Sequence, residues 1–192
     1  MRRRANAIRI IGGAWRSRRI DFPATLELRP TPDRVRETLF NWLGQDLSGK
    51  SCLDLYAGSG ALGFEAASRG AAEVTMVERD RAAFAALRAN AAMLGARNVR
   101  LVHADALEFI RAVRPCFDVV FLDPPFSLPL PQKVLARMPS LLCPGAVVYL
   151  ERGEPFEPCG GARVLKRARA GEVHFHLLDW GADDQGNLSG IV

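Results

Sequence analysis

The chain has 192 residues, of which 48% are hydrophobic and 24% are charged. This length fits one domain with a small appendage, and the composition is that of a globular protein rather than a disordered or fibrous one. No apolar run reaches the length of a membrane span, and none follows the charged residues 2–4 as a secretory signal requires. We therefore expect a cytoplasmic protein.

The four cysteines lie far apart in the sequence, at positions 52, 116, 143 and 159. None of them forms a C-x-x-C pair, so the spacing predicts neither a zinc site nor a disulfide framework. Cys52 falls within an apolar run and is expected to be a reduced core residue. We expect no metal to be needed.

The net charge of +5 is concentrated near the N-terminus. Residues 1–36 contain ten arginines and three acids, whereas the rest of the chain contains 16 basic and 18 acidic residues. A local basic excess of this kind is typical of a nucleic-acid-binding surface. The arginines expected to contact nucleic acid are Arg9, Arg16, Arg18, Arg19, Arg34 and Arg36.

The N-terminal region contains two short runs that favour β-structure, at 8–11 and 15–20, on either side of Gly12-Gly13. A Gly-Gly pair between such runs predicts a hairpin. A helix should follow, with Thr31 as its N-cap, Pro32 as its first residue and an end near residue 43. We expect residues 1–44 to form a basic extension and residues 45–192 to form the main domain.

From residue 51 onward, strand and helix patterns alternate, which indicates a mostly parallel sheet covered on both faces. The expected strands lie at 51–54, 74–78, 99–102, 117–122 and 146–150, and the expected helices at 64–69, 81–94, 106–113 and 131–142. Two last strands, 163–166 and 173–180, have no helix between them and should form an antiparallel pair at the sheet edge. The predicted fold class is α/β and Rossmann-like.

A glycine-rich loop follows the first strand of this domain, in the run from Asp54 to Gly63. Gly58, Gly60 and Gly63 satisfy G-x-G-x-x-G, and their missing Cβ atoms would let a ligand approach, so a dinucleotide site must be considered. Asp54 argues against it, because a carboxylate beside the loop would repel a pyrophosphate. It would suit a ligand with a cationic amino group, such as S-adenosylmethionine (SAM).

Acidic residues also end the next two strands, where ligands of open α/β sheets bind. Glu78 could accept the ribose hydroxyls of an adenosine, which NAD and SAM share. Asp105 could accept from the adenine amino group, with the Ala106 amide facing a ring nitrogen, and it could also cap a helix. The expected cofactor contacts are Asp54, Tyr56, Ala57, Gly58, Gly60, Glu78, Arg79, Asp105 and Ala106.

The tetrapeptide Asp123-Pro124-Pro125-Phe126 ends the fourth strand. Two consecutive prolines fix the backbone and leave the Asp123 carboxylate and the Pro124 carbonyl as free acceptors. Together they could hold the two hydrogens of an exocyclic NH₂ group, and Phe126 offers a ring on which a flipped base could stack. We expect Asp123, Pro124 and Phe126 to be the catalytic residues.

Residues 51–150 resemble the class I SAM-dependent methyltransferases, specifically the amino-methylating group with a (D/N)-P-P-(Y/F) motif. The run 28–41, the 8–13 segment and the tetrapeptide together resemble the bacterial 16S rRNA guanine-N2 methyltransferase family of the RsmD type. The resemblance implies monomethylation of one guanine amino group in small-subunit rRNA, with SAM as donor, on an assembled or assembling subunit. We expect the protein to act as a monomer.

Three alternatives remain open at this stage. A DNA or protein amide methyltransferase would share the glycine loop and the tetrapeptide without requiring the basic extension. An NAD-dependent oxidoreductase would leave Asp54 and the tetrapeptide unexplained. A non-catalytic RNA-binding assembly factor would not need an intact set of site residues.

Overall fold

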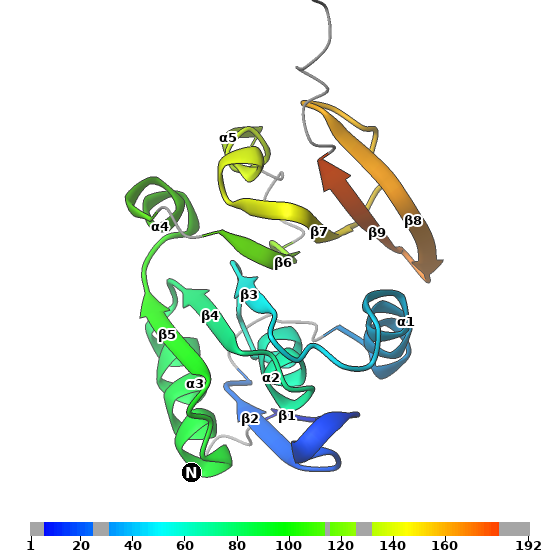
Figure 1. Ribbon diagram of the computed structural model, residues 1–192. Helices are drawn as coiled ribbons and strands as arrows, with labels where there is room; N and C mark the ends of the chain where they lie inside the picture. The colour runs from blue at the N-terminus through cyan, green and yellow to red at the C-terminus, as the bar shows by residue number, and fades with distance from the viewer. Residues whose placement is uncertain (1–5, 25–30, 114–115, 126–131, 181–192) are drawn as a thin grey trace, which may run out of the picture.

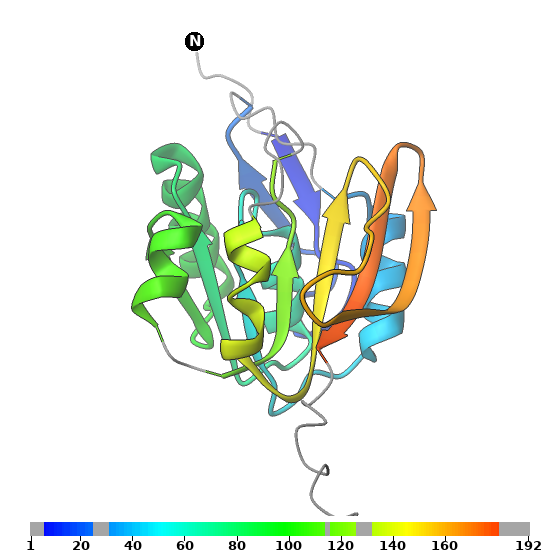
Figure 2. The ribbon, with the colours of Figure 1, turned by 90° about the horizontal axis from the view of Figure 1, so that it is seen from above.

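The structure is a computed structural model that describes residues 6–24, 31–113, 116–125 and 132–180. Seven strands form its central sheet in the order β5–β4–β3–β6–β7–β9–β8 (Figures 1 and 2). Five are parallel: β3 (Ser51–Asp54), β4 (Glu73–Glu78), β5 (Val99–His103), β6 (Phe117–Leu122) and β7 (Leu142–Arg152). The other two, β8 (Ala162–Ala170) and β9 (Val173–Trp180), are antiparallel and form one edge, as predicted.

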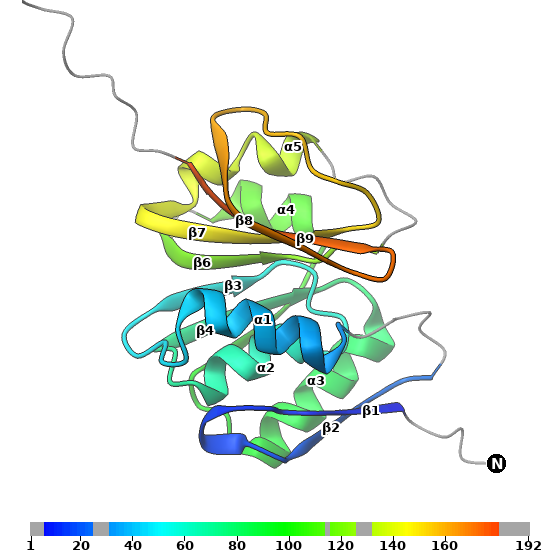
Figure 3. The ribbon, with the colours of Figure 1, turned by 90° about the vertical axis from the view of Figure 1, so that its right-hand side faces the viewer.

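Helices cover both faces of the sheet (Figure 3). One face carries α1 (Asp33–Leu43), α2 (Ala61–Ser68) and α3 (Arg81–Leu94), and the other carries α4 (Ala106–Ala112), α5 (Gln132–Leu135) and the short 3-10 helix η2 (Met138–Ser140). Successive residues of a strand point to opposite faces, so Cys52 packs in the first layer and Leu53 in the second. None of the helices in the described ranges has the length and apolar character needed to cross a bilayer.

The predicted N-terminal hairpin is present, but its glycines play a different role from the one expected. Strands β1 (Asn6–Arg9) and β2 (Arg19–Phe22) pair antiparallel, and residues 10–18, which include the short 3-10 helix η1 (Gly13–Trp15), connect them. Gly13 has a φ of +73°, and a Cβ there would lie 1.9 Å from the Ser68 carbonyl oxygen. The Gly12-Gly13 pair is therefore required by close contact with the end of α2, not by a tight turn.

The hairpin is fastened to the helices of the main domain (Figure 3). The Ile11 amide donates to Glu65 at 2.9 Å, and the Asp21 amide and carbonyl both bond to the Asn90 side chain, at 3.1 and 2.8 Å. Buried Ile10 and Ile20 belong to the same core layer as α1 and α2. The division at residue 44 stays a prediction about function, since the two parts share one core.

Two sequence predictions about residues 116–143 are wrong. The helix predicted at 131–142 is only α5 followed by η2, because Pro139 and the start of β7 at Leu142 leave no room for more. Cys116 and Cys143 form a disulfide with a Cα–Cα distance of 4.8 Å. The pairing of Phe117 with Leu142 brings them together, and a sequence separation of 27 gives no sign of it. Cys52 is free and buried, as predicted.

Candidate active site

The glycine loop between β3 and α2 is held by carboxylates that accept from its backbone. Asp54 is buried, and its Oδ2 accepts from the Gly63 amide at 2.9 Å. Glu78, from the end of β4, accepts from the Gly58 amide at 2.8 Å. The Gly60 amide donates to the Ala57 carbonyl at 2.6 Å. All three glycine amides of the motif are therefore already hydrogen-bonded within the protein.

Packing, rather than ligand approach, explains two of these glycines. Gly60 has a φ of +84°, and a Cβ there would lie 2.6 Å from the Phe64 ring. A Cβ on Gly63 would lie 2.8 Å from Met76, on the neighbouring strand. Gly60 and Gly63 thus let α2 pack closely against β4 and α3, and the contact of Gly60 with the cofactor stays a prediction.

These hydrogen bonds distinguish between the two cofactor classes. A dinucleotide site uses free loop amides at a helix N-terminus to bind the pyrophosphate. Here the Gly58 and Gly63 amides are committed to carboxylates, and the acids around the loop are suited to accept from cations and hydroxyls. This set of hydrogen-bond acceptors thus fits SAM, which carries an ammonium and a sulfonium and no phosphate.

The remaining predicted cofactor contacts lie at the same edge of the sheet. Asp105 follows β5 and caps α4 by accepting from the Leu107 amide at 2.8 Å, and its other oxygen lies 3.8 Å from an Arg79 nitrogen. Both capping and ligand contact are open to it, because a carboxylate has several acceptor positions. Tyr56 and Ala57 belong to the loop itself, and Ala106 is the first residue of α4. The structure thus brings these residues together around the carboxyl ends of β3, β4 and β5.

Asp123, just after β6, is held by a residue whose role the sequence analysis got wrong. Thr31 does not cap α1, which begins at Asp33 with Pro32 in the cap position and no side-chain cap. Its buried hydroxyl instead lies 3.1 Å from Asp123 Oδ2, where it donates a hydrogen bond. The Thr31-Pro32 pair therefore connects the N-terminal segment directly to Asp123, the first residue of the tetrapeptide predicted to be catalytic.

A second acid beside Asp123 was missed by the sequence analysis. Glu151, near the end of β7, is buried and accepts from the Tyr149 hydroxyl at 2.8 Å. Burial, and then the negative charge of Glu151, raise the pKa of Asp123 well above its ordinary value, while the Thr31 hydrogen bond lowers it. Burial likewise raises the pKa of Glu151. The expected strand ended at residue 150, one position short, so this acid did not stand out.

Burial also raises the pKa of Asp54, to about 7, with a smaller contribution from the charge of Glu78. Asp54, Asp123 and Glu151 thus form an acidic cluster at the carboxyl ends of β3, β6 and β7. Pro124, the next residue after Asp123, is buried. Phe126 lies outside the described residues, so its stacking role stays a prediction.

One predicted RNA contact is contradicted by the structure. Arg36 is 1% exposed and bonds to Glu65, Asp33 and the backbone of Arg9 and Thr31. Glu65 is itself fully buried and also pairs with Arg69, at 2.8 Å. A buried carboxylate requires compensating cations, so Arg36 is a structural ion-pair partner and cannot reach a phosphate.

The other arginines of the N-terminal region, Arg9, Arg16, Arg18, Arg19 and Arg34, are exposed. Arg9 lies 3.7 Å from Asp33, and Arg18 donates to the Met93 carbonyl at 2.7 Å. The connection that carries Arg16 and Arg18 packs against Ser68, the last residue of α2, whereas the glycine loop adjoins the first. These two arginines therefore lie toward the end of α2 away from the site.

The fold and the site together define a methyltransferase of the Rossmann-like class, which uses SAM as its methyl donor. A family described as Conserved hypothetical protein 95 matches residues 8–179. The chain is 42% identical over 176 residues to the Escherichia coli (strain K12) ribosomal RNA small subunit methyltransferase D, covering 88% of each chain. It is 39% identical over 182 residues to the Haemophilus influenzae protein of that name, covering 88% of this chain and 92% of the relative.

Solved structures agree with this assignment. The chain superposes on the Escherichia coli methyltransferase yhhF with a TM-score of 0.82 and 42% identity, covering 92% of this chain and 99% of the other. The chain therefore belongs to the Conserved hypothetical protein 95 family, together with the ribosomal RNA small subunit methyltransferase D proteins. The family resemblance and the fold predicted from the sequence are both confirmed.

Proposed function

We propose that this enzyme transfers a methyl group from SAM to the N2 amino group of one guanine in 16S rRNA, acting in the cytoplasm on assembled or assembling small subunits. The observation that carries the proposal is the position of Asp123. Its carboxylate lies at the end of β6, fixed by Thr31 and followed by two prolines, beside the acidic edge that suits SAM. The names of the relatives support rRNA as the substrate class.

Some residues at this edge are assigned to bind the cofactor, and others to bind the target base. We assign Asp54, Glu78 and Asp105 to SAM, which supplies an activated methyl group when it is bound. Asp123 and the Pro124 carbonyl accept hydrogen bonds from the two N–H groups of the guanine amino group. The lone pair of that nitrogen is delocalised into the ring, and these bonds favour a geometry in which it points toward the methyl donor. Such positioning contributes about 7–11 kcal/mol in well-oriented reactions.

The acidic cluster gives Asp123 a second task. When the guanine nitrogen accepts the methyl group, it must lose one proton. Because burial and Glu151 raise the pKa of Asp123, its ionised carboxylate is a stronger base than an ordinary aspartate and can take that proton. The Thr31 hydroxyl keeps the carboxylate oriented, and its hydrogen bond favours the ionised form.

A panel of methyl acceptors tests the proposal. The protein is incubated with radiolabelled SAM and, separately, with unmodified small subunits, naked 16S rRNA, duplex DNA and a release-factor protein. We expect label in 16S rRNA, from subunits or naked RNA. Label in DNA or protein and none in RNA would favour the other amino-methyltransferases. Label in none of them, with RNA still bound, would favour a non-catalytic assembly factor.

A further inference from the structure

The antiparallel edge of the sheet carries a cluster of cations that the sequence analysis did not single out. The β8–β9 hairpin contains four basic residues and two acids. Arg163 and Asp179 neutralise each other through two hydrogen bonds, at 3.0 and 2.6 Å. Lys166, Arg167 and Arg169 remain, all exposed, against the single acid Glu172 in the connecting turn.

The strand register aligns some of these basic residues, across β9, with the last residues of β7. Arg152 on β7 is opposite His174 on β9, which is opposite Arg169 on β8. A second row lies two residues earlier on β7, where His176 on β9 is opposite both Leu150 on β7 and Arg167 on β8. Since paired residues share a face, these side chains line one face of the sheet at its carboxyl edge. We call Arg152, Arg167, Arg169 and His174 the basic rim.

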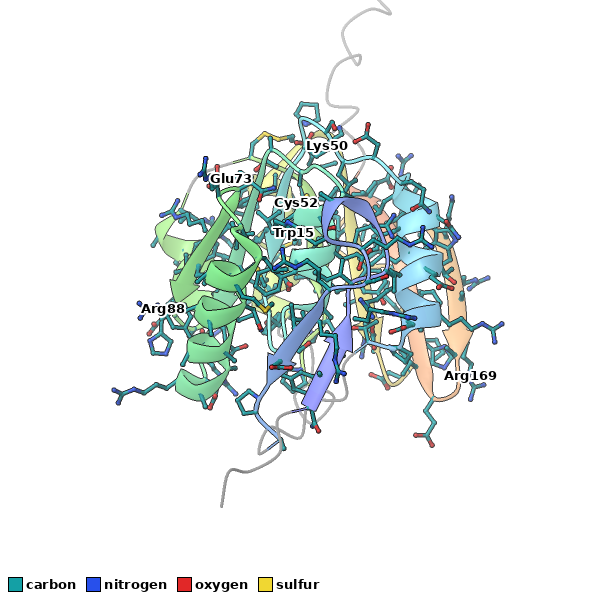
Figure 4. All side chains as sticks on the ribbon, turned by 90° about the horizontal axis from the view of Figure 1, so that it is seen from below. Trp15, Lys50, Cys52, Glu73, Arg88 and Arg169 are labelled. Atoms are coloured by element: carbon teal, nitrogen blue, oxygen red, sulfur yellow. A yellow bond between two sulfur atoms is a disulfide. The ribbon has the colours of Figure 1, made fainter. Side chains whose placement is uncertain are left out.

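The rim lies at the same edge of the sheet as the acidic cluster, but on the other face. Arg152 directly follows Glu151, so their side chains point to opposite faces: Glu151 to the α1–α3 side and Arg152 to the α4–α5 side. Neighbouring strands lie about 4.8 Å apart, which puts the Arg169 backbone about 10 Å from that of Arg152. Figure 4 shows Arg169 at the side of the molecule opposite to Lys50 and Glu73, which precede or begin parallel strands. The rim is thus at the edge where the strands end and where Asp123 lies.

The guanidinium groups of the rim have unused hydrogen-bonding capacity. Arg169 uses Nε to donate to the Gly171 carbonyl at 2.6 Å, and its two terminal nitrogens form no hydrogen bond within the described residues. Arg152 pairs with Glu154, whereas Arg167 and Arg169 form no ion pair with any carboxylate in the described part of the chain. Two unpaired arginines in a row with fixed spacing suit phosphate groups, which accept bidentate hydrogen bonds from guanidinium.

We propose that Arg167 and Arg169 of the basic rim bind phosphates of the RNA strand that flanks the target guanine. The identity of that RNA rests on the proposed function. The rim holds the strand beside the acidic cluster on the β7 side, whereas Arg16 and Arg18 of the N-terminal hairpin lie far from that cluster. Arg167 and Arg169 are two residues apart on β8, about 7 Å along the strand, so they can contact the phosphates of neighbouring nucleotides close to the target.

A double substitution tests the rim, with a matched control on the same strand. Arg167→Gln/Arg169→Gln removes both charges and keeps polar side chains, and Arg163→Ala removes an arginine at the other end of β8 that is already neutralised by Asp179. Binding to a 16S rRNA transcript is measured against salt concentration, after thermal melting has shown that both variants are folded. Loss of two contacts should lower the slope of log K against log[salt] by about 1.4 and weaken binding about 20- to 30-fold at 0.1 M salt.

An unchanged slope and affinity in the double variant would overturn the rim's role. The RNA-binding role would also be overturned if the double variant lost as much affinity for polyglutamate as for RNA, because the rim would then be a site for acidic protein chains. The two proposals fail separately. If wild type methylates 16S rRNA and the double variant binds RNA normally, the proposed role of the rim is wrong and the proposed function stands. If wild type methylates no rRNA but the double variant alone loses RNA binding, the rim stands and the proposed function is wrong.

Discussion

The hydrogen bond between Thr31 and Asp123 should set the pH dependence of methyl transfer. The Thr31 hydroxyl lies 3.1 Å from Asp123 Oδ2 and lowers the pKa of that carboxyl, against the larger effect of burial. Thr31→Val removes the hydroxyl and keeps the shape of the side chain. The pKa of Asp123 should then rise further, so that more of the enzyme is in the protonated, inactive form at a given pH.

The magnitude follows from the strength of hydrogen bonds to charged groups, about 1.5–3 kcal/mol. At 1.36 kcal/mol per factor of ten, Thr31→Val should lower the population of ionised Asp123 about 10- to 100-fold at a pH below the midpoint of the rate profile. The loss should shrink at high pH, where Asp123 is ionised in both proteins. Thr31→Ser, which keeps the hydroxyl, should restore the wild-type profile.

Glu151→Gln should change the pKa of Asp123 in the opposite direction. The Glu151 carboxylate raises the pKa of Asp123 by charge repulsion, so removing that charge should lower the pKa and move the rising limb of the profile to lower pH. The amide oxygen of the substituted side chain can still accept from the Tyr149 hydroxyl. The assay is the single-turnover methylation rate at saturating SAM between pH 5 and 9. Profiles that move in the same direction, or that do not move in either variant, would refute the assignment of Asp123 as the titrating group.

Three further predictions concern the cofactor loop, the hairpin and the disulfide. Asp54→Asn should raise the free energy of unfolding at pH 8 by about 4 kcal/mol and weaken SAM binding. The folded pKa of Asp54, about 7, exceeds the unfolded value, so the stability that this group contributes is full below about pH 4 and is lost as the pH rises through 7. Denaturant titrations of both proteins at pH 4 and pH 8, with SAM calorimetry, check this, and equal pH dependence would contradict it. Replacing Arg16, Arg18 and Arg19 with Ala should lower the salt slope of RNA binding by about 2 with unchanged SAM affinity, and an unchanged slope would rule out the hairpin as an RNA contact. Replacing Cys116 and Cys143 with Ala should lower the free energy of unfolding by about 3 kcal/mol, because the disulfide closes a loop of sequence separation 27. Wild type denatured without reductant should show two reactive thiols, Cys52 and Cys159, and four would show that the bond is absent.

The sheet and its helices could be predicted because each element carries its own local signal. Strand and helix periods, glycine caps such as Gly95 and the glycine loop are short-range patterns, and α3 and β9 begin and end where the sequence placed them. The acids at strand ends could also be predicted, since parallel topology places all carboxyl ends at one edge.

What the sequence could not show depends on contacts between distant segments. Threonine is a residue type that favours helix N-caps, which is why Thr31 was predicted to be one. In the structure it contacts Asp123, which is 92 residues away in the sequence. Arg36 resembles a surface cation, and only the buried Glu65 on α2 shows that it belongs to the core. The Gly12-Gly13 pair favours a hairpin turn on local grounds, and its contact with Ser68 is invisible without the fold.

The central claim is that Asp123 directs methyl transfer to a guanine N2 amino group in 16S rRNA. The most direct test is nucleoside mass spectrometry of 16S rRNA from unmodified small subunits after incubation with SAM and either wild type or Asp123→Ala. Asp179→Ala, which removes a carboxylate paired with Arg163 away from the site, serves as the control. We predict N2-methylguanosine at one position with wild type and Asp179→Ala, and a rate lowered about 10²–10³-fold with Asp123→Ala, whose SAM affinity stays normal. A different methylated nucleoside, or a normal rate with Asp123→Ala, would contradict the account.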